Sequence, residues 1–264
     1  MKLSFKLIAI LAIGAGLLTL QSCSDESGDD TEPTTPVGTS CYLTSSSEIS
    51  QGSNWPTTYT YDAANNLTSV TNDDITLNYT YSNGTLTRIS TNDGASVSVD
   101  YKGGNFPAQL DIAYDGEKST IKIMRDGDNI VTVEYYYEED GVSELEYKTE
   151  ISYNSDGTVN SVSELEYDPD TKTFETYSTI KNITSDDKEN PYLTSLGMII
   201  YTVINEEYEN LGKGNILTAQ YDYYLNDPSQ ITNSYTYNND GFPVTKQQTG
   251  FSDVTDYTFS YDCK

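Results

Sequence analysis

Residues 59–70, YTYDAANNLTSV, decide the fold class, because variants of this segment recur to the C-terminus. Tyr59 and Tyr61 are two residues apart, which places both rings on one face of a β-strand. Asn65-Asn66 favours a turn, since asparagine tolerates the left-handed backbone conformation that tight turns require. Leu67 and Val70 then supply the apolar residues of a second strand. The segment therefore predicts a β-hairpin with a tyrosine-bearing face.

The repeat continues along the chain with similar spacing. Its starts at residues 59, 79 and 99 are 20 apart, and later neighbours are 14–16 apart, which is the length of one hairpin. Tyrosine makes up 24 of the 264 residues, and it suits a half-buried pleated surface. Glycine follows Asn or Asp in six turns: Ser82-Asn83-Gly84, Asn92-Asp93-Gly94, Asp126-Gly127, Asp140-Gly141, Ser155-Asp156-Gly157 and Asn239-Asp240-Gly241. We therefore predict an all-β domain, a long antiparallel meander of hairpins.

After several turns, two apolar residues follow at a spacing of three, which breaks the two-residue period of a strand. The pairs are Leu67/Val70, Leu86/Ile89, Val142/Leu145 and Val159/Val162. Either the first residue covers the turn or a β-bulge follows it. Repeated bulges bend a sheet, so we expect the meander to be strongly curved or barrel-like.

Residues 181–215 depart from the pattern and form a predicted insert. Its apolar residues Leu196, Ile199, Ile200, Val203 and Ile204 have helical spacing, and Gly212-Lys213-Gly214 could stop a helix. The density of β-branched residues keeps a buried strand at 198–204 as the alternative to a helix. An insert in a regular meander could plug or cap one end of a barrel.

The N-terminus predicts export. Lys2 and Lys6 precede an apolar run at residues 7–20, and Leu20-Gln21-Ser22-Cys23 resembles a bacterial lipobox. We therefore predict a lipoprotein signal peptide at residues 1–22 and lipid attachment at Cys23. Ordinary secretion with an incidental cysteine is the alternative.

Residues 23–40 are acidic and rich in Ser, Thr, Pro and Gly, a composition typical of a disordered tether. Asp25, Glu26, Asp29 and Asp30 resemble the signal that sends Bacteroidetes lipoproteins to the outer face of the outer membrane. This resemblance implies a lipid-anchored protein facing the cell exterior. A periplasm-facing protein with a merely solvated linker is the alternative.

The strong negative charge limits the partners. Loss of the signal peptide removes Lys2 and Lys6, which changes the formal net charge from −27 to −29. Nucleic acids and anionic membrane surfaces would be repelled. Solubility alone explains such a charge, and a cationic partner would also suit it.

Two cysteines remain once Cys23 carries lipid. Cys41 and Cys263 lie at the two ends of the presumed domain, residues 41–264. A disulfide between them would join the first and last strands, and on the chain-entropy model it would contribute about 4–5 kcal/mol. Two free thiols are the alternative.

Several of these features together resemble a known group of proteins. The lipobox, the acidic tether, the tyrosine-rich hairpins and the insert motifs Asn190-Pro191-Tyr192 and Lys213-Gly214-Asn215 resemble an uncharacterised family of Bacteroidetes gut lipoproteins. The resemblance covers residues 41–264 and implies a porin-like β fold without a known activity. The hairpins are also similar to YD-repeat (Rhs-type) proteins, although only Tyr61-Asp62 and its neighbours match that signature. Because the faces opposite the tyrosines are polar, we do not expect a membrane-spanning pore.

No motif indicates catalysis. The chain has no histidine, which excludes a Ser-His-Asp triad and a histidine metal site. Paired carboxylates could serve a glycosidase, but 41 acidic residues produce such pairs by chance. Alternating carboxylates at Glu144, Glu146, Glu164 and Glu166 are interpreted as a charged solvent face. Asp126-Gly127-Asp128-Asn129 and Asn72-Asp73-Asp74 are interpreted as turns and not as calcium loops, and we expect neither a metal nor a cofactor.

Trp55 is the one candidate ligand-binding residue. It is the sole tryptophan of the chain, in Asn54-Trp55-Pro56, and an exposed indole could stack on a sugar ring. A role as a core or edge anchor is the alternative. The leading function hypothesis is a non-catalytic protein that binds a glycan or a peptide at the cell surface. A carboxylate-based hydrolase and a purely structural surface protein remain as alternatives, and the sequence does not indicate the oligomeric state.

Overall fold

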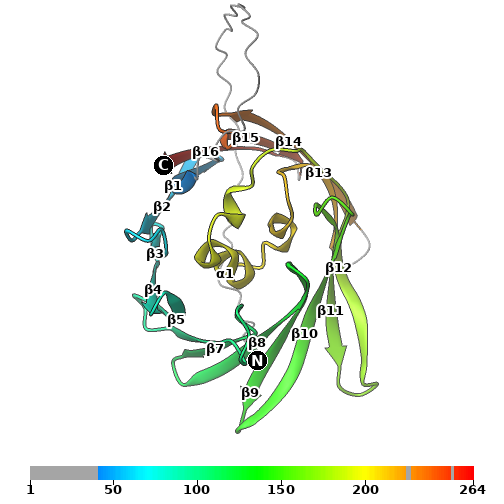
Figure 1. Cartoon of the computed structure of the whole chain (residues 1–264). Helices are drawn as coiled ribbons and strands as arrows, with labels where there is room; N and C mark the ends of the chain where they lie inside the picture. The colour runs from blue at the N-terminus through cyan, green and yellow to red at the C-terminus, as the bar shows by residue number, and fades with distance from the viewer. Residues whose placement is uncertain (1–40, 224–226, 251–252) are drawn as a thin grey trace, which may run out of the picture.

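The computed structural model describes residues 41–223, 227–250 and 253–264. Within these ranges the chain forms a closed antiparallel barrel of sixteen strands, which follow one another around the barrel in sequence order (Figure 1). The barrel closes where β1 (Cys41–Ser50) pairs with β16 (Asp253–Cys263). The predicted all-β meander is therefore confirmed, and its sheet is closed.

The other strands have the following bounds: β2 (Ser53–Tyr61), β3 (Leu67–Thr71), β4 (Thr76–Ser82), β5 (Thr85–Thr91), β6 (Ser96–Asp100), β7 (Gln109–Tyr114), β8 (Glu117–Asp126), β9 (Asn129–Glu139), β10 (Val142–Tyr153), β11 (Val159–Asp168), β12 (Thr173–Ser185), β13 (Ile216–Tyr223), β14 (Asp227–Tyr237) and β15 (Pro243–Gly250).

The hairpins follow from the turn residues and the tyrosine pattern. Asn83 and Gly84 have φ angles of 51° and 78°, as in a type I′ turn, whose twist matches that of the flanking strands. In β4, Tyr79 is buried whereas Asn78 and Thr80 are exposed. The tyrosine face therefore points into the barrel and the Asn/Thr face points out.

Bulges explain the apolar spacing of three. Tyr59 pairs with Val70 and Tyr61 with Leu67, and the register shifts between these two pairs. Because the extra residue restores the phase of the strand, Leu67 and Val70 are both buried inside the barrel. A register shift of the same kind lies between Leu86 and Ile89 and between Val159 and Val162.

For the pair Val142/Leu145 the bulge explanation does not hold. Val142 is 57% exposed, and the nearest register shift lies after Leu145, between Leu145 and Tyr147. The bulge therefore cannot bring Val142 to the inner face.

The insert lies inside the ring of strands (Figure 1). It contains two short 3-10 helices, η1 (Pro191–Leu193) and η2 (Tyr208–Leu211), on either side of α1 (Leu196–Ile204). The helix prediction is confirmed and the strand alternative is wrong, because residues 196–204 form α1. Ser195 caps this helix by accepting a hydrogen bond from the Met198 N–H at 3.2 Å. The insert is shorter than predicted, since β12 continues to Ser185.

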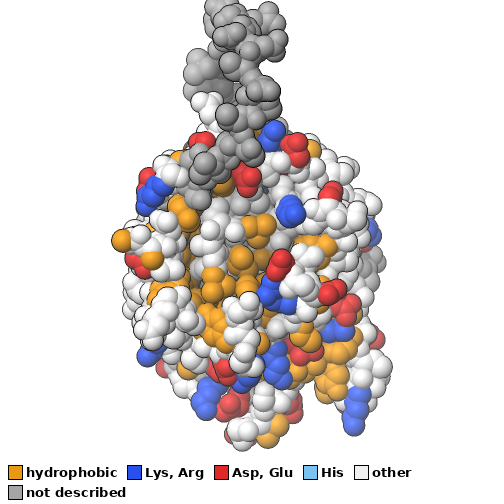
Figure 2. Space-filling view, in the orientation of Figure 1, with side chains coloured by type: hydrophobic (Ala, Val, Ile, Leu, Met, Phe, Trp, Pro, Cys, Tyr) orange, Lys and Arg blue, Asp and Glu red, His pale blue; other side chains and the backbone are white. Residues whose placement is uncertain are grey.

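The core is the contact between the insert and the inner wall. Met198, Ile200, Val203 and Tyr208 are at most 1% exposed. Burial of each such side chain contributes about 1.5–3 kcal/mol, so the insert is an integral part of the folded domain. In Figure 2, side chains cover the centre of the barrel, many of them hydrophobic, and no opening is visible in this view.

The two ends of the barrel differ. We call the end with Cys41 and Cys263 the proximal end; the connections from β12 and to β13 place both ends of the insert there. The opposite, distal end carries the turn between β1 and β2 at Gln51-Gly52. The insert thus enters from the end at which β1 begins.

The interpretation of the alternating glutamates needs one correction. Glu164 lies on the inward face of β11, two residues from the buried Val162, and its carboxylate accepts a hydrogen bond from the Ser178 hydroxyl. Glu144, Glu146 and Glu166 are exposed, as predicted. Bulges after Leu145 and near Leu165 shift the phase of these strands, so the four residues do not share one face.

Candidate ligand-binding site inside the barrel

Five inward-facing residues form a continuous cross-strand row, which we call the lumen row: Trp55, Glu48, Tyr257, Lys246 and Tyr235. Each member is directly opposite the next on the neighbouring strand. Trp55 is on β2, where it shares a face with the buried Tyr59, and Glu48 is on β1, where it shares a face with the buried Ser50. The row therefore places aromatic, acidic and basic side chains side by side on the inner wall.

The insert brings further charged groups to this wall. Glu207 and Glu209, at the start of η2, both affect the pKa of Lys246 and of Tyr257. Asn210 Nδ2 donates a hydrogen bond to Glu207 at 3.4 Å, and the Tyr221 hydroxyl donates one to Glu209 at 3.1 Å. Glu48, Glu207 and Glu209 thus all act electrostatically on the ammonium group of Lys246.

Burial governs the protonation of this cluster. It raises the pKa of Glu207 to about 7, with a further contribution from Glu209 and with Lys246 opposing. Burial also raises the pKa of Glu48 and of Glu209. It lowers the pKa of Lys246 against the attraction of the three carboxylates. All four residues nevertheless retain partial exposure to solvent.

Two hydrogen-bond donors beside Glu48 lack partners. Among the described residues, neither Trp55 Nε1 nor Ser50 Oγ makes a hydrogen bond, although both atoms are buried. Ser50 is 1% exposed and lies two residues from Glu48 on the same face of β1. Trp55 Nε1 and Ser50 Oγ are two of ten buried side-chain nitrogen and oxygen atoms without a partner in the described residues, and these two lie beside Glu48, where a polar ligand group would pair with them.

Lys246 also borders a cavity between the insert and the wall. Its volume is about 30 Å³, and it is partly open to solvent. Asn190, Tyr192, Asn210 and Asn215 line its insert side. Lys246 Nζ lies 4.2 Å from the centroid of the Tyr257 ring and makes no ion pair within the described part of the chain. Its three N–H donors therefore remain available.

The two motifs that carried the family resemblance hold the insert in place. Asn190 Nδ2 donates to the carbonyl oxygens of Asn210 and Gly212, both at 2.8 Å, and its Oδ1 accepts from the Tyr192 N–H at 2.9 Å. The Asn215 N–H donates to Asp186 Oδ1 at 2.8 Å, which joins the two ends of the insert.

Hydrogen bonds also fasten the insert to the opposite wall. The Tyr135 hydroxyl is hydrogen-bonded to that of Tyr208, and the Tyr147 hydroxyl donates to Glu206 at 2.9 Å. The rings of Tyr135 and Tyr147 stack with centroids 4.1 Å apart. The tyrosines that define the repeat therefore position the insert as well as filling the barrel.

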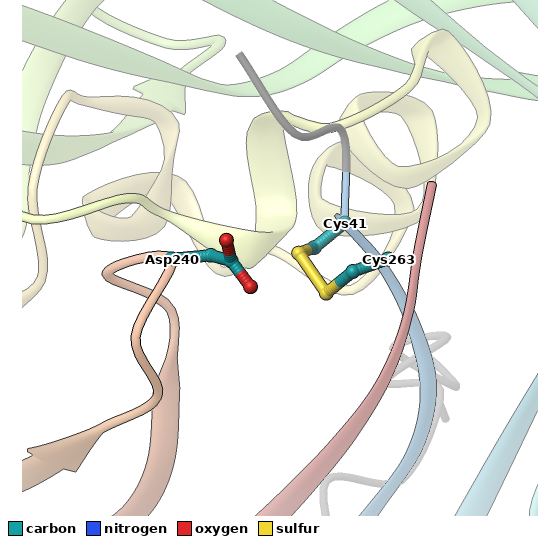
Figure 3. A group of neighbouring side chains, drawn as sticks. All are labelled: Cys41, Asp240 and Cys263. Atoms are coloured by element: carbon teal, nitrogen blue, oxygen red, sulfur yellow. A yellow bond between two sulfur atoms is a disulfide. The ribbon is translucent and has the colours of Figure 1, made fainter. Parts of the chain in front are cut away.

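Cys41 and Cys263 form a disulfide, and Asp240 in the turn after β14 approaches it (Figure 3). One ligand atom from each of the three residues lies within 4.8 Å of the others. Both sulfur atoms are committed to the disulfide, so they offer no thiolate to a metal. Asn72 binds its own turn by accepting the Ile75 N–H at 2.8 Å, as expected for a structural turn.

The predicted site residues differ in where they lie. Cys23 lies outside the described residues. Trp55 lies half-buried on the inner wall, next to Glu48, where both an anchoring and a binding role are open to it. Sequence reasoning missed Glu48, Lys246, Glu207 and Glu209. The position of the two insert glutamates after the apolar helix was the one available signal.

Comparisons with known proteins agree on the fold. The RHS Repeat family model matches residues 44–74, the first hairpins of the barrel. No curated protein matches the chain. A crystal structure of a porin-like protein from Bacteroides uniformis is similar, with a TM-score of 0.56, 14% identity, and coverage of 87% of this chain and 98% of that one.

A porin-like protein from Bacteroides vulgatus has a TM-score of 0.57 and 11% identity, and the match covers 84% of this chain and 98% of that one. At these identities the likeness concerns the fold. The resemblance to a porin-like β fold, with weaker similarity to YD-repeat hairpins, is therefore confirmed.

Proposed function

We propose that this chain is a non-catalytic, lipid-anchored binding protein of the bacterial outer surface, with its ligand site on the lumen row. The observation that supports this function most is the pair of buried, unpartnered donors on Trp55 and Ser50 beside Glu48. Their neighbours Lys246 and Glu207 bring further polar groups to the same wall and keep part of their surface exposed.

The fixed insert argues against a pore. Asn190 and Asn215 hold both of its ends. Met198, Ile200 and Val203 of the insert are fully buried, so opening a channel would require local unfolding of the core. None of the helices in the described ranges has the length and apolar character needed to cross a membrane.

The outer surface of the barrel is polar, unlike the apolar band of a transmembrane barrel. Its exposed outward residues include Thr58, Thr60, Asn78, Thr80, Glu150, Ser152, Thr232, Ser234, Thr236, Thr245, Gln247 and Thr249. This surface favours a barrel in water that is held to the membrane by lipid at Cys23.

Binding can be tested with the purified mature protein. A partial digest of plant polysaccharides and a tryptic digest of casein are added separately, and binding is measured by thermal shift and by Trp55 fluorescence. A saturable response to either mixture, reduced in Glu48→Ala and retained in the outward-facing control Ile49→Ala, supports the proposal. No response to either mixture would refute it and favour a structural surface protein.

The anchor and location have separate tests. Mass spectrometry of membrane-extracted protein should find acyl chains on Cys23, and proteinase added to intact cells should degrade the protein. An unmodified cysteine contradicts the anchor, and protection in intact cells contradicts exposure at the surface.

The alternative function is a carboxylate-based hydrolase, and one observation favours it. Glu207, whose pKa burial raises to about 7, could donate a proton, and Glu209 would be the second carboxyl group of the pair that a glycosidase needs. Release of nitrophenol from aryl glycosides by the wild type, abolished in Glu207→Gln, would support this function. Equal rates in both proteins would exclude this role for Glu207.

A further inference from the structure

We infer that the lumen row takes a neutral, hydroxyl-rich ligand, namely the end of an uncharged oligosaccharide. This inference rests on the proposed function and names the ligand class of the same site. It is drawn from the hydrogen-bonding capacity, the charge and the topology of the residues around Trp55 and Glu48.

The polar groups of the site require a ligand that both donates and accepts. Trp55 Nε1, Ser50 Oγ and Lys246 Nζ offer donors, whereas the Glu48 carboxylate accepts. A sugar hydroxyl does both at one atom, and adjacent hydroxyls on a ring can bridge such neighbouring groups. The rings of Trp55 and Tyr257 flank Glu48 on either side, which adds the aromatic surface that a sugar ring packs against.

The charge of the site disfavours ionic ligands. An anionic sugar would meet Glu48, Glu207 and Glu209, which outnumber the single Lys246. A cationic group would be attracted by these carboxylates, but Lys246 would repel it, and it would lose its hydration in a site where burial already lowers the pKa of Lys246. A neutral ligand avoids both costs.

The closed barrel disfavours an extended peptide. Peptides commonly bind by adding a strand to an open sheet edge. Here β1 pairs with β16, so the barrel has no free edge beside the lumen row. A peptide could bind only through side chains, without the backbone hydrogen bonds that supply much of the affinity in that mode.

The sole tryptophan of the chain makes the test direct, because intrinsic indole fluorescence reports on Trp55 alone. The mature protein is titrated with cellohexaose, xylohexaose and mannohexaose, with hexagalacturonate as the anionic comparison and a casein digest as the peptide comparison. At least one neutral hexasaccharide should change the Trp55 emission saturably, and hexagalacturonate should not.

Matched variants place the binding at the row. Glu48→Ala and Ser50→Ala should each weaken the neutral sugar about tenfold or more, as loss of a buried hydrogen bond predicts, while Ile49→Ala should not. If Glu48→Ala does not fold, Ser50→Ala and the wild-type selectivity still decide the question.

The outcomes separate the two proposals. Binding of hexagalacturonate or of the peptides, without binding of a neutral sugar, overturns the ligand class but leaves a binding function in place. Failure of every probe, together with failure of the two crude digests, overturns both. Binding of a neutral sugar that is unaffected by either variant also refutes the assignment to the lumen row.

Discussion

Replacing Gly212 by alanine should displace the C-terminal end of the insert. A Cβ at this position would lie 2.5 Å from the Val159 backbone N and 2.8 Å from Val159 Cγ2. The φ of −94° is one that alanine adopts freely, so the penalty comes from this contact alone. Because the nearest atom belongs to the backbone of β11, the wall cannot yield as a side chain would. Overpacking of this kind costs about 3 kcal/mol.

Urea unfolding of the wild type and of Gly212→Ala, followed by Trp55 fluorescence, measures this penalty. Gly104→Ala is the matched control, since its Cβ would approach nothing more closely than Tyr101 O at 3.3 Å. The free energy of unfolding of Gly104→Ala should lie within about 1 kcal/mol of that of the wild type. The reasoning is refuted if Gly212→Ala is as stable as Gly104→Ala, because the insert could then not be packed against β11 as described.

Three further predictions concern the same domain. Asn190→Ala should lower the free energy of unfolding by about 2–4 kcal/mol in the same assay, since two buried carbonyls lose their donor; a loss below about 0.5 kcal/mol would show that the motif does not hold the insert. The double variant Cys41→Ser, Cys263→Ser should have a free energy of unfolding about 5 kcal/mol below that of the oxidised wild type and equal to that of the reduced wild type. Equal stability of the double variant and the oxidised protein would contradict a role for the disulfide in closing the barrel. Burial raises the folded-state pKa of Glu207 to about 7. Between about pH 4.5 and 7 Glu207 therefore ionises in the unfolded state but keeps its proton in the folded state. The wild type should lose stability relative to Glu207→Gln as the pH rises through this range. Denaturation midpoints at pH 4.5, 6 and 8 measure this difference, and a gap between the two proteins that does not change with pH would contradict the buried position of Glu207.

The barrel was predictable because its local signals agree with one another. Tyr79 and Tyr81 alternate with exposed polar residues, and Asn83-Gly84 supplies the φ values that the turn needs. Closure of the barrel was expected only as one possible form of a curved sheet, since pairing of β1 with β16 depends on the shape of the whole meander.

The candidate site was largely hidden in the sequence because both faces of these strands carry polar residues. Lys246 stands between Thr245 and Gln247, and nothing in that triplet marks the central residue as the inward one. A single bulge reverses the assignment of faces, as Glu164 shows. The acidic residues of the insert form part of a site only because the fold brings Glu207 beside Lys246, which is 39 positions later in the sequence.

A crystal structure of the mature protein, soaked with the neutral hexasaccharide that binds best in solution, tests the central claim most directly. The account predicts difference density for a sugar ring within hydrogen-bond distance of Glu48 and of at least one of the donors on Trp55 and Ser50, with the insert unmoved. Sugar density on the outer surface alone, or an insert displaced from the barrel, would contradict it.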